Sequence, residues 1–137
     1  MIVDSSALIA ILRKEPERPR FVRLILDAPQ RWMSAASYVE TGLVIDGAKD
    51  PALSRKFDQL MTRLRVQVVE VTEAQARAAR SAHAEFGRGS GHRARLNFGD
   101  CFSYALAMER DDVLLFKGDD FGHTDVRVAD RVGGGGA

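Results

Sequence analysis

The sequence contains a single cysteine, Cys101, among its 137 residues. One thiol cannot form a disulfide within the chain, so a disulfide-stapled fold is excluded and a reducing compartment such as the cytoplasm is expected. No apolar run approaches the roughly 20 residues that a membrane-spanning helix needs. The first residues show no basic stretch before an apolar segment and no small-residue cleavage site, so we expect neither a signal peptide nor a membrane partner.

The sequence also lacks an excess of charge of either sign. The 20 lysine and arginine residues nearly balance the 19 aspartate and glutamate residues, and the net charge of +1 predicts no partner. Arginine dominates the cations, which suits bidentate contacts with phosphate or carboxylate, although a GC-rich genome would also enrich arginine. A hydrophobic content of 45% and a charged content of 28% are ordinary for a globular protein. The length fits one domain.

Short apolar segments alternate with segments of helical period along the chain. Strands are predicted at 1–3, 31–34, 66–71, 113–116 and 126–128. Helices are expected between them, the first capped by Ser5 or Ser6 and the last a buried helix over 99–110. This alternation predicts an α/β fold with a parallel sheet covered on both faces. We expect one domain over residues 1–132 and a flexible glycine-rich tail over 133–137.

Acidic side chains accompany the predicted strands at the sheet edge where open α/β folds bind ligands. Asp4 follows the first strand directly, and Asp119 and Asp120 follow the strand VLLF. Asp100 lies in the first turn of the buried helix before that strand, and Glu40 lies beside the apolar stripe of a helix after the second strand. Carboxylates gathered at one edge repel one another unless a cation neutralises them, and oxygen ligands suit Mg²⁺.

Each acid also has a structural explanation by itself. Asp4 could cap the first helix, and Asp100 could be a first-turn acid favoured by the helix dipole. Glu40 could be an exposed helical residue, and the two aspartates after VLLF could belong to a polar turn. The joint pattern favours a metal site. The histidines are scattered, and no Cys/His spacing suggests zinc.

Four segments together resemble the PIN-domain ribonucleases, and in particular the VapC-like toxins of bacterial type II toxin–antitoxin pairs. The segments are IVDSSALIAIL with Asp4, SYVE with Glu40, NFGDCFSYALA with Asp100, and LLFKGDDFGHTD. The resemblance covers essentially the whole chain in length, motif order and spacing. It implies a single Rossmann-like PIN domain, with a parallel sheet of about five strands and helices on both faces.

The resemblance also implies an activity and partners. The activity is endonucleolytic hydrolysis of RNA phosphodiester bonds by metal-activated water, with Mg²⁺ or Mn²⁺ as the cofactor. Family members usually form homodimers and are held inactive by a cognate antitoxin that covers or enters the acidic groove. The expected partners are therefore an RNA substrate, an antitoxin protein and a second copy of the chain.

The matching residues follow motif by motif. Asp4, Glu40 and Asp100 match the acids of the family, with Asp4 and Asp100 as metal ligands, and Ser6 matches a hydroxyl beside the first acid. The fourth acid stays open because the turn KGDDF offers two adjacent aspartates and does not reproduce the family's spacing cleanly. Asp125 is a more distant candidate.

Basic residues gather in the glycine-rich segment GRGSGHRARL, just before Asp100. They are Arg88, Arg93 and Arg95, with His92 between them. A flexible basic loop beside an acidic metal site can hold a phosphate backbone, which predicts a substrate-binding role for the three arginines. A solvated loop without a ligand is the alternative.

Two other functions remain open. A degenerate PIN-like domain would bind RNA or a partner without catalysis, but such domains lose acids, and the main positions are filled here. A receiver-like phospho-signalling module also places Mg²⁺-binding acids at a parallel sheet edge, with a lysine where Lys117 follows VLLF. A receiver, however, needs a second acid beside Asp4 and an aspartate at the end of VQVVEV, and the sequence has neither.

Overall fold

The computed structural model describes residues 1–129; residues 130–132 and the expected tail at 133–137 lie outside the described part. Strands and helices alternate along the chain, as the sequence pattern predicts. The elements are β1 (Ile2–Val3), α1 (Ser5–Leu12), α2 (Arg18–Asp27), β2 (Trp32–Ser34), α3 (Ala35–Gly47), α4 (Pro51–Leu64), β3 (Gln67–Val69), α5 (Glu73–Phe86), α6 (Phe98–Arg110), β4 (Leu114–Leu115) and the 3₁₀ helix η1 (Asp120–His123). Over residues 1–129, no helix is both long enough and apolar enough to cross a membrane.

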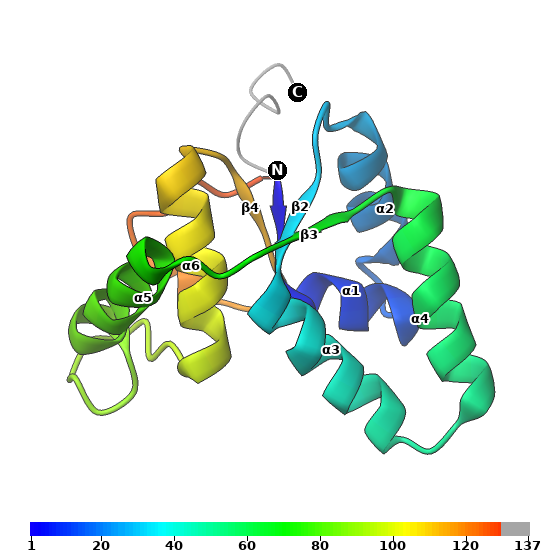
Figure 1. Cartoon of the computed structure of the whole chain (residues 1–137), viewed down its shortest axis with the longest axis horizontal. Helices are drawn as coiled ribbons and strands as arrows, with labels where there is room; N and C mark the ends of the chain where they lie inside the picture. The colour runs from blue at the N-terminus through cyan, green and yellow to red at the C-terminus, as the bar shows by residue number, and fades with distance from the viewer. Residues whose placement is uncertain (130–137) are drawn as a thin grey trace.

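All strands run parallel in one sheet with the order β3–β2–β1–β4. β1 has a neighbour on each side, because Ile2 pairs with Trp32 of β2 and with Leu114 of β4. The carboxyl ends of parallel strands meet at one edge, where α1 and α3 begin. Figure 1 shows the N-terminal end of α6 at this same edge. The fold therefore gathers the starts of three helices where the strands end.

The sheet has four strands within residues 1–129, so the expectation of about five is wrong by one. The segment expected as a fifth strand makes only an isolated bridge between Val128 and Leu114. Leu114 N–H donates to the Arg127 carbonyl at 2.8 Å, and Ala129 N–H donates to the Leu114 carbonyl at 3.0 Å. The residues before Val128 form the 3₁₀ helix η1 and the turn that follows it. Val128 alone therefore pairs with the edge of β4.

The central strand contributes to two hydrophobic cores, because neighbouring side chains of a strand point to opposite faces. Val3 packs on one face with α1, α2 and α4, where Phe21 and Ile25 are fully buried. Ile2 packs on the other face with α5 and α6, where Leu106 is fully buried. Figure 1 shows these two groups of helices on opposite sides of the strands. Coverage of both faces is thus confirmed.

Polar caps fix where the helices begin. Asn97 and Asp100 form a capping box at α6, and single side chains cap α3, α4 and α5, namely Ser34, Asp50 and Thr72. The cap of α1 is Asp4 rather than the expected Ser5 or Ser6. Because β1 ends at Val3, the next residue keeps an extended backbone, and its Oδ2 accepts the Ser6 N–H at 3.0 Å.

Arg31 joins the C-terminal ends of two helices just before β2. Its guanidinium donates to the carbonyl oxygens of Leu26 at 2.7 Å and Ala28 at 3.3 Å, at the end of α2. It also donates to the Leu64 carbonyl at 2.8 Å, at the end of α4. The last carbonyls of a helix have no partner inside the helix, so one side chain here satisfies groups from two elements.

We expect Arg31→Ala to lower the free energy of unfolding by about 2 kcal/mol, because hydrogen bonds to a charged group are stronger than neutral ones. Urea unfolding followed by circular dichroism measures the change. The control is Arg23→Ala, which removes an exposed arginine from α2, the helix whose last carbonyls Arg31 binds. Equal stability of the two variants would show that the contacts of Arg31 contribute nothing specific.

Candidate active site

Acidic side chains from four elements meet at the carboxyl edge of the sheet. Asp4 follows β1 and is 1% exposed, while Glu40 lies on α3. Asp100 lies in the first turn of α6, and Asp120 begins η1. The charges of Asp4, Glu40 and Asp120 each raise the pKa of Asp100. These residues are named the acid cluster below (Asp4, Glu40, Asp100 and Asp120).

The other two candidates for a fourth acid lie in different surroundings. Asp119 lines a separate pocket next to Lys117. Asp125 accepts a hydrogen bond from the Tyr104 hydroxyl at 2.6 Å. Of the two adjacent aspartates in the turn, Asp120 is therefore the one whose charge acts on Asp100.

Hydroxyl groups hold both oxygens of the buried Asp4 carboxylate. Ser103 Oγ donates to Oδ1 at 2.5 Å, and Ser6 Oγ donates to Oδ2 at 2.7 Å. The fully buried Ser37 hydroxyl lies 3.0 Å from Ser103 Oγ, and Lys117 N–H donates to Ser6 Oγ at 3.0 Å. Asp4 thus has one orientation, set by α3, α6 and the chain after β4.

Glu40 reaches the start of α6 only because residue 99 is glycine. A Cβ atom placed on Gly99 would lie 1.8 Å from Glu40 Oε2, which no side chain could accommodate. Ser5 Oγ donates to the other oxygen, Oε1, at 2.5 Å. The carboxylate is therefore fixed between the first turns of α1 and α6, beside Asp100.

Asp100 has the most perturbed carboxyl group of the site. Its pKa is raised from 3.8 to about 7, with burial as the largest cause and smaller contributions from the charges of Asp4, Glu40 and Asp120. The backbone N–H of Asn97 donates to its Oδ2 at 3.0 Å and lowers the pKa, but by less. The folded state therefore disfavours the charged form of Asp100, mainly because the carboxyl group is buried and also because three carboxylates act on it.

The chemistry of these side chains fits a hard divalent cation. Carboxylate and hydroxyl oxygens are the ligands that Mg²⁺ and Mn²⁺ prefer. Within residues 1–129, no three acidic, histidine or cysteine side chains are already arranged as a metal-binding group. Mg²⁺ keeps several waters and needs only one or two carboxylates, so a complete protein cage is not required. A cation would also offset the mutual repulsion that raises the pKa of Asp100.

Residues 1–127 match the family described as the PIN domain. The chain belongs to the PIN-domain family. It is 55% identical over 132 residues to the protein named Ribonuclease VapC28 of Mycobacterium tuberculosis, a match that covers 96% of this chain and 99% of that protein. The resemblance of the sequence to VapC-like PIN domains is confirmed, and the receiver-like alternative is excluded.

Solved structures share the fold of this PIN domain at low sequence identity. The crystal structure of Mycobacterium tuberculosis VapC20, described as a Sarcin-Ricin loop cleaving toxin, superimposes with a TM-score of 0.72 at 17% identity, covering 91% of this chain and 95% of that chain. A toxin-antitoxin complex from Klebsiella pneumoniae gives a TM-score of 0.65 at 18% identity, covering 88% of each chain. At these identities the likeness concerns the fold alone.

The basic loop of this PIN domain leads directly into the cap of α6. Arg88 N–H donates to the Leu96 carbonyl at 2.9 Å, which closes the loop at its base. The His92 ring packs edge-on against Phe86 at 4.9 Å and so belongs to the loop's scaffold. The predicted substrate-binding side chains, Arg88, Arg93 and Arg95, are all exposed.

Several residues that shape the acid cluster were missed by the sequence analysis. They are the hydroxyl partners and the close-approach glycine, namely Ser5, Ser37, Ser103 and Gly99. Helical spacing could have indicated two of them, since Ser103 follows Asp100 by three positions and Ser37 precedes Glu40 by three. Nothing in the sequence shows that these hydroxyls contact an acid from another element.

Removing the Ser103 hydroxyl should loosen Asp4. We expect Ser103→Ala to weaken Mn²⁺ binding by about tenfold, because a group that orients a ligating carboxylate affects affinity by roughly 10–100-fold. Isothermal titration calorimetry measures the affinity, and circular dichroism verifies the fold. Ser103→Thr keeps the hydroxyl and should retain affinity better than alanine. Unchanged affinity in Ser103→Ala would show that Asp4 does not need this donor.

The raised pKa of Asp100 makes stability depend on pH. A carboxyl group whose folded pKa exceeds its unfolded value contributes stability below pH 4, and that contribution is lost as the pH rises through about 7. Asp100→Asn resembles the protonated form, so we expect it to be more stable than wild type at pH 8 by on the order of 1–2 kcal/mol, after allowance for partial exposure. Urea unfolding in EDTA at pH 4 and pH 8 measures the difference, which should be smaller at pH 4. If Asp100→Asn is no more stable than wild type at pH 8, the charged Asp100 carboxylate does not destabilise the folded state as expected.

Proposed function

We propose that this chain is a metal-dependent endoribonuclease and the toxin of a type II toxin–antitoxin pair. The observation that carries the proposal is the acid cluster at the carboxyl edge of a PIN-domain sheet. A protein named as a ribonuclease at 55% identity over nearly the whole chain supports the same activity. The reaction is hydrolysis of an RNA phosphodiester bond.

Mg²⁺ or Mn²⁺ is the cofactor we assign to the acid cluster. Asp4 and Asp100 are the proposed ligands, directly or through water, with Asp120 as the fourth acid. A divalent cation in such a site supplies positive charge that stabilises the phosphodiester transition state and makes water a better nucleophile. Ser6 and Ser103 support this role by holding Asp4 in one orientation.

The chain's own groups position the attacking water. Glu40 has one oxygen bound by Ser5 Oγ, and its second oxygen accepts no hydrogen bond from the described residues. We assign that second oxygen, Oε2, to orienting the water or to helping bind the metal. The water oxygen attacks phosphorus and gives up a proton, the bond from phosphorus to the leaving oxygen breaks, and the leaving oxygen takes up a proton, so that one water is consumed.

The basic loop (residues 87–96) is the part of the chain that we assign to binding the phosphate backbone of the RNA. Arg88, Arg93 and Arg95 are exposed. They lie on a loop that ends at Asn97, the cap of α6, and Asp100 follows in the first turn of that helix. Arginine forms bidentate contacts with phosphate that fix the strand without reading its sequence. The arginine side chains of the loop therefore supply the positive charge that binds the RNA phosphates, which the acid cluster itself would repel.

The remaining parts of the proposal concern partners. We propose a cognate antitoxin as protein partner, a homodimer as assembly state and the cytoplasm as location. A chain in the solved toxin-antitoxin complex from Klebsiella pneumoniae has the same fold, so this fold is compatible with an antitoxin partner. A non-catalytic domain that binds RNA or protein is the alternative, and it predicts RNA binding in Mn²⁺ without cleavage.

Cleavage of a labelled total-RNA pool tests the activity directly. Antitoxin-free wild type should give discrete products with Mg²⁺ or Mn²⁺ and none with EDTA. Asp4→Asn should lose cleavage by at least about a hundredfold while keeping its fold, because the amide cannot supply the charge that a cation needs. Absence of cleavage by folded wild type in either metal would favour the non-catalytic alternative.

The fourth acid is tested by comparing two neighbouring substitutions. Asp120→Asn should lower kcat by roughly tenfold or more, because Asp120 lies in the acid cluster. Asp119→Asn should lower kcat less, because its carboxylate lines a separate pocket. Single-turnover cleavage of one mapped RNA site gives both values. A larger loss of kcat in Asp119→Asn than in Asp120→Asn would make Asp119 the fourth acid.

A further inference from the structure

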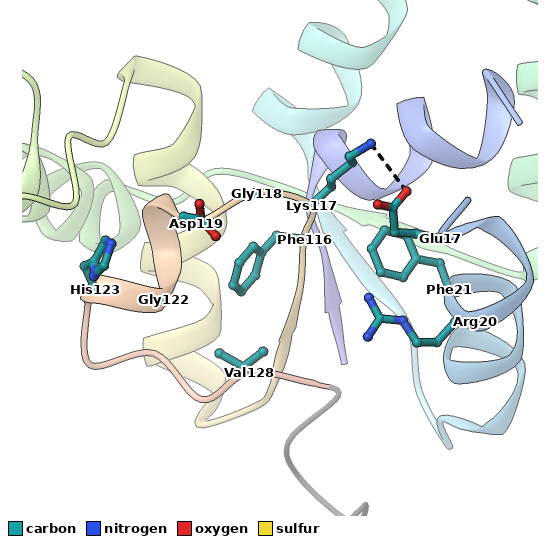
Figure 2. Close-up of a pocket in the computed structure, with 10 residues that line it drawn as sticks. All are labelled: Glu17, Arg20, Phe21, Phe116, Lys117, Gly118, Asp119, Gly122, His123 and Val128. Atoms are coloured by element: carbon teal, nitrogen blue, oxygen red, sulfur yellow. Dashed lines mark ion pairs between the residues drawn. The ribbon is translucent and has the colours of Figure 1, made fainter. Parts of the chain in front are cut away.

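A second pocket lies beside the acid cluster, between α2 and the chain that follows β4. Its volume is about 400 Å³, within the range of small-ligand sites. One wall comes from the start of α2 and includes Arg20 and Phe21, and the other comes from residues 116–123. Figure 2 shows the Arg20 guanidinium facing the pocket from one wall and Asp119 and His123 on the opposite wall.

The pocket shares a segment of chain with the acid cluster. Lys117 lines the pocket, and its N–H donates to Ser6 Oγ, which in turn donates to Asp4. Asp119 lines the pocket, while the next residue, Asp120, belongs to the acid cluster. The Cα atoms of adjacent residues such as Asp119 and Asp120 are about 3.8 Å apart. An RNA strand bound at the acid cluster therefore needs to extend only a short distance to enter the pocket.

The pocket combines the partly exposed ring of Phe116 with charged side chains of both signs. Phe116 and Phe21 line it, and the Phe116 ring is supported by Phe121 at 5.0 Å. The Lys117 ammonium is paired with Glu15 and Glu17, which ties the two walls together. The Arg20 guanidinium lies 5.3 Å from the centre of the Phe21 ring, on the pocket wall formed by α2.

We propose that this pocket is a subsite for one unpaired nucleotide of the RNA strand, next to the phosphate that is cleaved. The base stacks on Phe116, and Arg20 contacts the adjoining phosphate. Stacking on aromatic rings combined with basic contacts to the backbone is the general way in which proteins hold single strands. The proposal rests on the ribonuclease function proposed above.

The charges of the lining favour a nucleotide over a free inorganic anion. Asp119 lines the pocket and would repel a small anion, whereas the charge of Glu17 is paired with Lys117. A nucleotide keeps its charge at the phosphate, beside Arg20, and places a neutral flat base inside. The carboxylate of Asp119 can then accept a hydrogen bond from a base N–H group.

Binding of a fluorescein-labelled single-stranded RNA, measured by anisotropy in EDTA, tests the subsite without cleavage. Arg20→Gln should weaken binding at least fivefold. The matched control, Arg23→Gln, removes an exposed arginine of the same helix that does not line the pocket and should change binding less than twofold. Equal effects of the two variants would overturn the proposal, because they would indicate attraction by net charge alone.

A second measurement locates the base. Phe116→Leu keeps an apolar contact with Phe121 but removes the stacking surface, and it should also weaken binding at least threefold. With 5′-ribonucleoside monophosphates in EDTA, the amide resonances of Lys117, Gly118 and Gly122 should shift in nuclear magnetic resonance spectra. Shifts confined to the basic loop, or normal RNA affinity in Phe116→Leu, would overturn the subsite.

The outcomes separate the subsite from the ribonuclease function. RNA cleavage by wild type together with unchanged binding in Arg20→Gln would reject the subsite and leave the enzyme. Nucleotide shifts at residues 117–122 without cleavage in any metal would reject the enzyme and leave a nucleotide-binding pocket. In the cleavage assay, Arg20→Gln should raise KM at least fivefold while lowering kcat less than twofold.

Discussion

The Asp4 carboxylate is the group on which the rest of the site depends. It is almost fully buried at the end of the central strand, and its two oxygens accept hydrogen bonds from Ser103 and Ser6. A buried carboxylate without partners would be strongly destabilising, so the hydroxyls make its burial possible. They also connect α1, α6 and the chain after β4, because Ser6 in turn accepts from Lys117 N–H.

Electrostatic strain accompanies this arrangement. Burial and three neighbouring carboxylates raise the pKa of Asp100 to about 7, which means that the folded chain gathers like charges it does not neutralise internally. Perturbed groups of this kind gather at functional sites, where a ligand supplies the missing charge. In the proposed function, a divalent cation would supply positive charge within the acid cluster, and the exposed arginines of the basic loop would bind the RNA backbone.

Local chemistry explains why much of the fold and part of the site were predictable. The alternation of apolar strands and helices predicted the parallel sheet. Side chains of the types that favour helix starts, Asn97, Asp50 and Thr72, lie where helices begin. Strand number was overestimated because 126–128 has the composition of a strand, whereas its pairing depends on how many residues reach the edge of β4. Helix capping at α1 was misassigned because two serines compete with Asp4, and only the end of β1 decides between them.

The sequence by itself determined the family of the fold and predicted Asp4, Glu40 and Asp100 as acids of one site, because these depend on residue type and local spacing. Tertiary structure decided that the charge of Asp120 acts on Asp100 while the neighbouring Asp119 lines a separate pocket. It also decided that Gly99 admits Glu40 and that Ser103 serves Asp4, 99 positions away. Contacts between distant segments form only when the chain packs, and no local pattern encodes them.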